Sequence, residues 1–208
     1  MVFTSKMFQP KGDSFDDTFL FVGPSIANRE EKLDFPLDNT GEKPLIYISM
    51  GTINNKCDTF YNHCIEAFGE ENYQVIMSVG SKTDIATLNQ IPSNFIVRNY
   101  IPQLEVLKHT DVMLSHGGLN SVSEALYYGV PLIVLPQAND QPMVAQQLIS
   151  LKAGIELKLD EITPEILRDS VHKLLSDNNY KNNCTEIGKS FLQAGGYKKA
   201  VEHILNYR

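Results

Sequence analysis

The chain has 208 residues, of which 42% are hydrophobic, and a formal net charge of -7 at pH 7. This length supports one substantial hydrophobic core, so one domain is the default expectation. The acidic balance argues against broad nucleic-acid binding, which requires clustered Lys and Arg. No apolar stretch approaches the roughly 20 residues of a membrane span. The first residues, MVFTSKMFQP, lack the pattern of a secretory signal peptide, so we expect a cytoplasmic location.

Residues 1–43 are predicted to be an irregular linker. They are dense in Gly, Pro, Asp and Asn, and only one short apolar run, Thr18–Val22, interrupts them. From Pro44 onwards, short apolar runs rich in β-branched residues alternate with helical patterns.

Strands are expected at Leu45–Ser49, Gln74–Val79, Phe95–Val97, Val112–Leu114 and Leu132–Leu135, with a weaker one at Ile155–Leu159. Helices are expected at Cys57–Phe68, Leu104–Lys108, Asn120–Tyr128, Gln141–Leu151, Pro164–Ser176, Tyr180–Ala194 and Tyr197–Tyr207. This alternation predicts an α/β fold over residues 44–208, a Rossmann-like parallel sheet with helices on both faces. In such sheets ligands bind at the carboxyl ends of the strands, so the loops that follow the strands should carry the site.

The most informative loop is Ser115-His116-Gly117-Gly118-Leu119-Asn120-Ser121, between a predicted strand and a predicted helix. Its glycines allow a close approach of backbone to ligand, and the helix start offers N–H groups and a positive dipole end to an anion. Glu124 lies on the same helix face as Asn120 and Ser121, where it could accept hydrogen bonds from ribose hydroxyls. The alternative is that Asn120 or Ser121 only caps the helix.

Three further loops place polar or aromatic groups at the same edge. Tyr100-Ile101-Pro102-Gln103 follows the third strand, and its aromatic ring could stack on a base. Taken alone, this segment favours the alternative, an ordinary rim tyrosine followed by a proline at the first position of a helix. Asp140 and Gln141 follow the fifth strand and have the chemistry of a sugar-hydroxyl clamp, with helix capping by Asp140 as the alternative. Thr52, after the first strand, adds a hydroxyl.

Four blocks of the sequence resemble, in order and in spacing, the donor signature of family 1 UDP-glycosyltransferases of GT-B fold, especially the bacterial macrolide-glycosyltransferase type. They are Tyr100-Ile101-Pro102-Gln103, His116-Gly117-Gly118-Leu119-Asn120-Ser121, Glu124 and Asp140-Gln141. The resemblance covers essentially the whole chain, with FVGPSI at residues 21–26 similar to the interdomain connector and the rest similar to the C-terminal, donor-binding domain.

The resemblance implies a role for each site residue. Tyr100 would stack on uracil, Ile101 would contact the base through its backbone, and Gln103 and Glu124 would bind ribose. The diphosphate would be held by His116, Asn120, Ser121 and the amides of Gly118 and Leu119, and the sugar by Asp140 and Gln141. The family often has tryptophan where this chain has Tyr100, which bears on the preference for uracil.

His116 is interpreted as a hydrogen-bond donor to phosphate. It has no partner at metal-ligand spacing, and the resemblance implies transfer without a metal or other cofactor. The helix start and His116 would stabilise the departing diphosphate.

By the same resemblance, the enzyme is an inverting hexosyltransferase whose catalytic base lies in an N-terminal acceptor domain, so this chain would contain no catalytic residue and would be inactive alone. We expect an excised half of such an enzyme. The alternative within the class is a natural donor subunit of a two-subunit N-acetylglucosaminyltransferase. A nucleotide-sugar epimerase would carry its own acid and base, and a non-catalytic binding domain would have lost the polar residues of these loops.

The expected partners are a UDP-sugar, the acceptor domain and, through exposed apolar surface on the last helices, a second copy of the chain in a weak homodimer.

Overall fold

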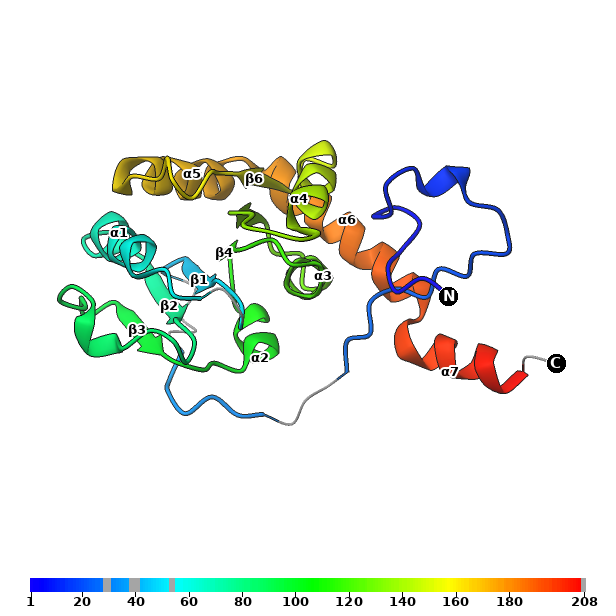
Figure 1. Ribbon diagram of the computed structural model, residues 1–208, viewed down its shortest axis with the longest axis horizontal. Helices are drawn as coiled ribbons and strands as arrows, with labels where there is room; N and C mark the ends of the chain where they lie inside the picture. The colour runs from blue at the N-terminus through cyan, green and yellow to red at the C-terminus, as the bar shows by residue number, and fades with distance from the viewer. Residues whose placement is uncertain (28–30, 38–41, 53–54, 207–208) are drawn as a thin grey trace.

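A six-stranded parallel sheet forms the centre of the protein (Figure 1). The computed structural model describes residues 1–27, 31–37, 42–52 and 55–206. The strands are β1 (Leu45–Ser49), β2 (Gln74–Ser78), β3 (Phe95–Arg98), β4 (Val112–Ser115), β5 (Leu132–Val134) and β6 (Gly154–Glu156), in the order β3-β2-β1-β4-β5-β6.

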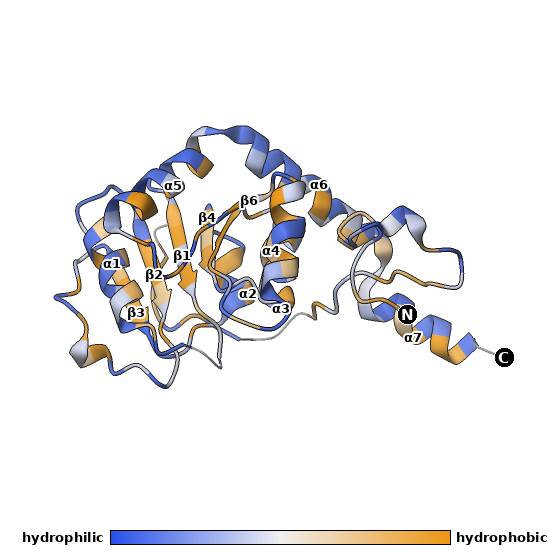
Figure 2. Ribbon diagram, turned by 45° about the horizontal axis from the view of Figure 1, so that its top comes forward, coloured by the Kyte–Doolittle hydropathy of each residue, from blue (hydrophilic) through white to orange (hydrophobic). Residues whose placement is uncertain are grey.

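Helices cover both faces of this sheet. Side chains of α1 (Asp58–Phe68) and α5 (Pro164–Ser176) bury one face, together with Ile46 and Ile48 of β1. Side chains of α2 (Gln103–Leu107), α3 (Leu119–Tyr127), α4 (Gln141–Ser150) and α6 (Asn178–Ala194) bury the other face, with Leu45 and Tyr47. The strands are apolar along their length for this reason, as Figure 2 shows. The predicted fold class is confirmed. No helix in the described ranges is both long and apolar enough to cross a membrane.

Most boundaries differ from the prediction by no more than one residue, and the two larger differences have identifiable reasons. β6 ends at Glu156 rather than at residue 159, because the Leu157 amide pairs with the carbonyl of Val134, the last residue of β5, and the neighbouring strand stops there. α6 begins at Asn178 rather than at residue 180, because the Asp177 carboxylate accepts a hydrogen bond from the Asn179 amide and caps the helix.

The N-terminal segment is irregular, as predicted, but it is also packed. Apart from a 3-10 turn at Gly12–Ser14, residues 1–27 fold back on themselves and lie against α6 (Figure 1). Phe8 is buried and meets Phe191 of α6 edge to face at 5.8 Å, and Ser5 Oγ lies 2.7 Å from Ser190 Oγ. Residues 28–30 and 38–41 of the predicted linker, and Tyr207 at the predicted end of α7 (Gly196–Asn206), lie outside the described residues. The domain boundary at residue 43 stays a prediction.

The strand order reverses direction between β1 and β4, and this reversal positions the site. The chain builds β1, β2 and β3 in one direction and then returns to place β4 on the other side of β1. The loops that leave β1 and β4 therefore diverge, and they open a crevice at the carboxyl ends of these two strands.

We expect Phe8→Ala to lower the free energy of unfolding by about 3 kcal/mol, because it removes a buried ring and leaves a cavity against α6. Phe3→Ala is the matched control, since Phe3 is 51% exposed and its change should stay within about 0.5 kcal/mol. Urea denaturation of the three proteins measures both. Equal stability of Phe8→Ala and the wild type would show that the N-terminal segment does not contribute to the folded domain.

Candidate functional site

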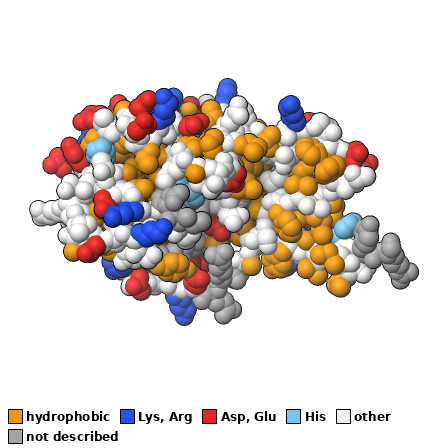
Figure 3. Space-filling view, in the orientation of Figure 1, with side chains coloured by type: hydrophobic (Ala, Val, Ile, Leu, Met, Phe, Trp, Pro, Cys, Tyr) orange, Lys and Arg blue, Asp and Glu red, His pale blue; other side chains and the backbone are white. Residues whose placement is uncertain are grey.

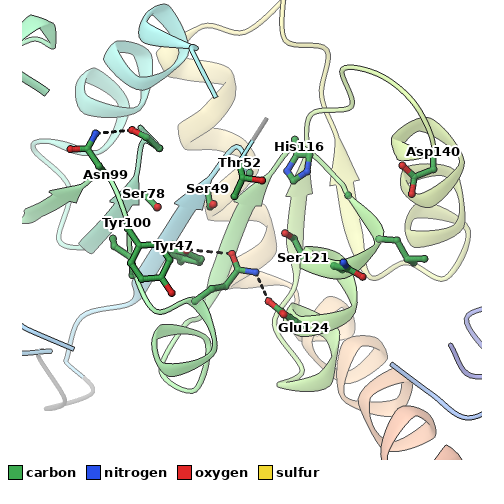
Figure 4. A pocket seen from close by; sticks show the side chains of 17 residues that line it. Tyr47, Ser49, Thr52, Ser78, Asn99, Tyr100, His116, Ser121, Glu124 and Asp140 are labelled. Atoms are coloured by element: carbon green, nitrogen blue, oxygen red, sulfur yellow. Dashed lines mark hydrogen bonds between the residues drawn. The ribbon is translucent and has the colours of Figure 1, made fainter. Parts of the chain in front are cut away.

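A cavity of about 590 Å³ opens at the carboxyl ends of the strands (Figure 4). Loops after β1, β2, β3, β4 and β5 all contribute to its wall. The lining residues are Tyr47, Ser49, Gly51, Thr52, Ser78, Gly80, Asn99, Tyr100, Ile101, Gln103, His116, Gly118, Leu119, Asn120, Ser121, Glu124 and Asp140.

The N-terminus of α3 faces this cavity. The helix starts at Leu119 with Gly118 at its N-cap position, and within the described part of the chain no side chain caps it. The first N–H groups of a helix have no intrahelical partner and carry the positive end of its dipole. Leu119, Asn120 and Ser121 of this first turn line the cavity. The alternative that Asn120 or Ser121 serves as the helix cap is therefore wrong, and a helix start of this kind can hold an anion.

The imidazole of His116 lies between two glycines at the mouth of the α3 turn. A Cβ atom on Gly51 would stand 2.6 Å from His116 Cε1, and one on Gly118 would stand 2.6 Å from His116 Nε2. Only glycine leaves room for the ring at either position. Burial lowers the pKa of His116 below its ordinary value, and the Asp140 carboxylate opposes that shift. At neutral pH the imidazole is therefore uncharged, with one N–H to donate.

Three side chains form a hydrogen-bonded chain on the floor of the cavity. The Tyr47 hydroxyl donates to Gln103 Oε1 at 3.3 Å, and Gln103 Nε2 donates to Glu124 Oε2 at 2.6 Å, as the dashed lines of Figure 4 trace. The chain links β1, α2 and α3, so it fixes the Glu124 carboxylate one turn beyond the helix start.

The loop after β3 forms one wall. Tyr100 is 67% exposed, and its hydroxyl donates to Glu31 Oε2 at 2.6 Å, whereas Ile101 is buried. Asn99 Nδ2 donates to the carbonyls of Gly80 and Thr83, at 2.6 and 3.0 Å, and so ties this loop to the loop after β2. The ring of Tyr100 stands at the rim, where a flat ligand can stack on it.

Asp140 and Gln141 differ in position. Asp140 lines the cavity at the N-cap position of α4, yet among the described residues it makes no side-chain capping hydrogen bond, so the capping alternative is wrong for Asp140 too. Gln141 is buried, and its Oε1 accepts from the amides of Gln137 at 2.7 Å and Ala138 at 3.1 Å. In this arrangement Gln141 holds the loop that carries Asp140.

The structure thus brings eleven of the predicted residues to one cavity: Thr52, Tyr100, Ile101, Gln103, His116, Gly118, Leu119, Asn120, Ser121, Glu124 and Asp140. Sequence reasoning missed the other six lining residues, Tyr47, Ser49, Gly51, Ser78, Gly80 and Asn99. The sequence does contain a pattern that could have identified Tyr47 and Ser49. They are hydroxyl-bearing residues two positions apart on a strand that is otherwise apolar, so their side chains lie on the same face of the sheet. Among the described residues, no group of three or more His, Cys, Asp or Glu side chains could hold a metal ion.

We expect His116 to titrate below the ordinary histidine value of about 6.5, because burial disfavours the imidazolium. Asp140→Asn should lower this pKa further, since it removes the charge that opposes the shift, whereas Asp13→Asn, in the distant N-terminal segment, should leave it unchanged. NMR titration of the imidazole protons measures all three.

The lowered pKa of His116 also determines how the stability of the folded protein changes with pH. Neutral His116 contributes stability above the unfolded-state pKa, and that contribution is lost as the pH falls through the folded-state pKa. A wild-type midpoint at or above the ordinary value would contradict the buried position of the ring.

The chain is similar to known glycosyltransferases over nearly its whole length. The family described as "Erythromycin biosynthesis protein CIII-like, C-terminal domain" matches residues 47–202. "Uncharacterized UDP-glucosyltransferase YdhE" of Bacillus subtilis is 43% identical over 204 residues, covering 98% of this chain and 52% of the relative. "NDP-glycosyltransferase YjiC" of the same organism is 41% identical, with the same coverage of each chain.

The solved structure of CalG4, the calicheamicin glycosyltransferase, superposes with a TM-score of 0.91 at 30% identity, covering 99% of this chain and 52% of that one. The chain therefore spans about half the length of the curated relatives it matches. It belongs to the Erythromycin biosynthesis protein CIII-like C-terminal domain family, the C-terminal half of GT-B glycosyltransferases of the family 1 UDP-glycosyltransferase type.

Proposed function

We propose that this domain binds the UDP-hexose donor, such as UDP-glucose, of an inverting glycosyltransferase that acts on a small-molecule acceptor. The observation that carries the proposal is the uncapped start of α3, to which the described residues contribute no side-chain cap, beside His116 in a cavity that also holds Glu124 and Tyr100. The relatives are named as UDP-glucosyltransferase and NDP-glycosyltransferase, which supports a nucleotide sugar as the ligand.

The order of groups along the cavity matches the order of groups along a nucleoside diphosphate. The helix start and His116 supply donors for the diphosphate. Glu124 lies five residues further along α3, about 7.5 Å along the helix axis, where it accepts from the ribose next to the α-phosphate. Tyr100, at the rim, stacks on uracil while the Ile101 backbone contacts its edge. Gln103 supports the ribose contact.

Asp140 stands on the opposite side of His116 from Tyr100 (Figure 4), which places it at the sugar end of the ligand. We assign the contact with the sugar hydroxyls to Asp140. Because the Gln141 Oε1 accepts from the Gln137 and Ala138 amides, its contact with the sugar would come from the Nε2 group. Thr52 supplies a hydroxyl from the loop after β1.

In this proposal the domain stabilises the leaving group. As the bond from the sugar to UDP breaks, negative charge develops on the diphosphate, and the α3 dipole, the Gly118 and Leu119 amides and His116 stabilise that charge without a metal. The base that deprotonates the acceptor belongs to a separate acceptor domain, and the enzyme works in the cytoplasm.

The acceptor domain would cover an apolar face that α7 presents. Val201, Ile204 and Leu205 of this helix are 49%, 57% and 78% exposed. Figure 3 shows hydrophobic side chains gathered at this end of the molecule, over the N-terminal segment and α7. The weak homodimer expected from the sequence would use the same face, and light scattering at high protein concentration tests it.

Isothermal titration tests the donor site. We expect the chain to bind UDP and UDP-glucose and to bind ADP more weakly. Glu124→Gln should weaken UDP binding by about 10- to 100-fold, the range for loss of a hydrogen bond to a charged group. His116→Ala should also weaken it, because one donor to the diphosphate is lost.

Glu105→Gln is the matched control for the carboxylate. Glu105 lies on α2 outside the cavity, paired with Lys108 at 2.6 Å, so its substitution should leave UDP affinity unchanged. Added EDTA should also have no effect on UDP affinity. Equal affinity for ADP and UDP, or a Glu124→Gln protein that binds like the wild type, would overturn the proposed donor.

A further inference from the structure

Tyr47 is a buried polar residue on the floor of the nucleotide cavity. It lies in the middle of β1, is only 1% exposed, and still contributes to the cavity wall. A phenylalanine would fill the same apolar layer, so the hydroxyl needs an explanation beyond packing. Ser49 and Ser78 also lie within hydrogen-bonding reach of this hydroxyl, and the contact that leads on to Glu124 is its donation to the side-chain amide oxygen of Gln103.

The Glu124 carboxylate determines which way that amide points. An ionised carboxylate only accepts hydrogen bonds, so the Gln103 group that faces it at 2.6 Å is the NH₂. The amide oxygen then faces Tyr47, and the phenol donates to it at 3.3 Å. Rotating the amide by half a turn would set its oxygen against the carboxylate, with two acceptors facing each other.

Burial keeps the phenol in its donating form. Desolvation raises the pKa of Tyr47 well above its ordinary value, and the nearby Glu124 carboxylate raises it further. The hydroxyl is therefore protonated at neutral pH. The relay, meaning the two hydrogen bonds from Tyr47 to Gln103 and from Gln103 to Glu124, then has each donor pointing toward Glu124.

We propose that Tyr47 is a positioning residue for sugar recognition within the nucleotide: through Gln103 it holds the Glu124 carboxylate as a fixed acceptor, and this makes the site select ribose over 2′-deoxyribose nucleotides. The inference rests on the proposed donor function. A fixed, partly desolvated acceptor discriminates strongly, because a ligand without the matching hydroxyl leaves it unpaired. A mobile carboxylate would turn to water and lose that discrimination.

The test compares the dissociation constants of UDP and 2′-deoxy-UDP. The wild type should prefer UDP by about tenfold or more, the value of one hydrogen bond to a charged group. Tyr47→Phe keeps the ring in the core and removes only the hydroxyl. It should weaken UDP binding by about fivefold and 2′-deoxy-UDP binding by less than about twofold, so that the preference narrows.

Two further variants separate positioning from general loosening. Tyr61→Phe is the matched control, because Tyr61 is also fully buried but donates to the Asn55 carbonyl instead, at 3.1 Å; its preference for UDP should equal that of the wild type. Gln103→Ala should narrow the preference as Tyr47→Phe does. In the Gln103→Ala background, Tyr47→Phe should then change UDP affinity by less than about twofold, since the relay is already broken.

The outcomes distinguish this inference from the proposed function. A wild type that binds no UDP overturns both. If the wild type binds UDP, three results with Tyr47→Phe would overturn only the role of Tyr47. The preference for UDP over 2′-deoxy-UDP could stay unchanged, or the affinities for both nucleotides could fall equally. The substitution could also weaken UDP binding as strongly in the Gln103→Ala protein as in the wild type. Thermal melts of each variant confirm that the folded protein is being compared.

Discussion

The start of α3 is the feature on which the rest of the site depends. A helix that begins at a glycine, with no side-chain cap from the described residues, leaves its first N–H groups to a ligand or to water. The reversal of strand order between β1 and β4 opens the crevice into which these groups point. Three further parts of the cavity connect to this helix: His116 precedes it, Glu124 lies within it, and Tyr47 reaches it through Gln103.

In the proposed donor site, this acidic chain would hold an anionic ligand by local interactions. With a net charge of -7, the protein offers no general attraction for phosphate. Dipole and backbone amides supply the attraction instead, and the imidazole of His116 can remain uncharged and still donate. The absence of a Cβ at Gly51 and Gly118 leaves room for that ring beside the helix start, so in the proposed mechanism the donor is in place before the leaving group acquires charge.

The sequence predicted the sheet and the edge that carries the site, because both depend on local patterns. Apolar β-branched runs located the strands, and the glycine turn at residues 117 and 118 located the helix start.

Most features that the sequence did not predict depend on contacts between residues that are distant in the chain. The end of β6 depends on where β5 stops, and the packing of Phe8 on Phe191 joins residues that lie far apart in the chain. The role of Tyr47 emerges only when β1, α2 and α3 are brought together, since its strand position alone reads as core. Gln141 illustrates the opposite case: its position beside Asp140 indicated a sugar contact, whereas the structure turns its Oε1 onto two backbone amides.

The central claim is that the first turn of α3 receives a diphosphate. Amide ¹H–¹⁵N NMR spectra of the chain, recorded during titration with UDP and separately with uridine, test it most directly. The account predicts that the amides of Leu119, Asn120 and Ser121 shift with UDP and stay in place with uridine, because only UDP brings phosphate to the helix start. Binding of UDP that leaves these three amides unmoved, or equal shifts with uridine, would contradict it.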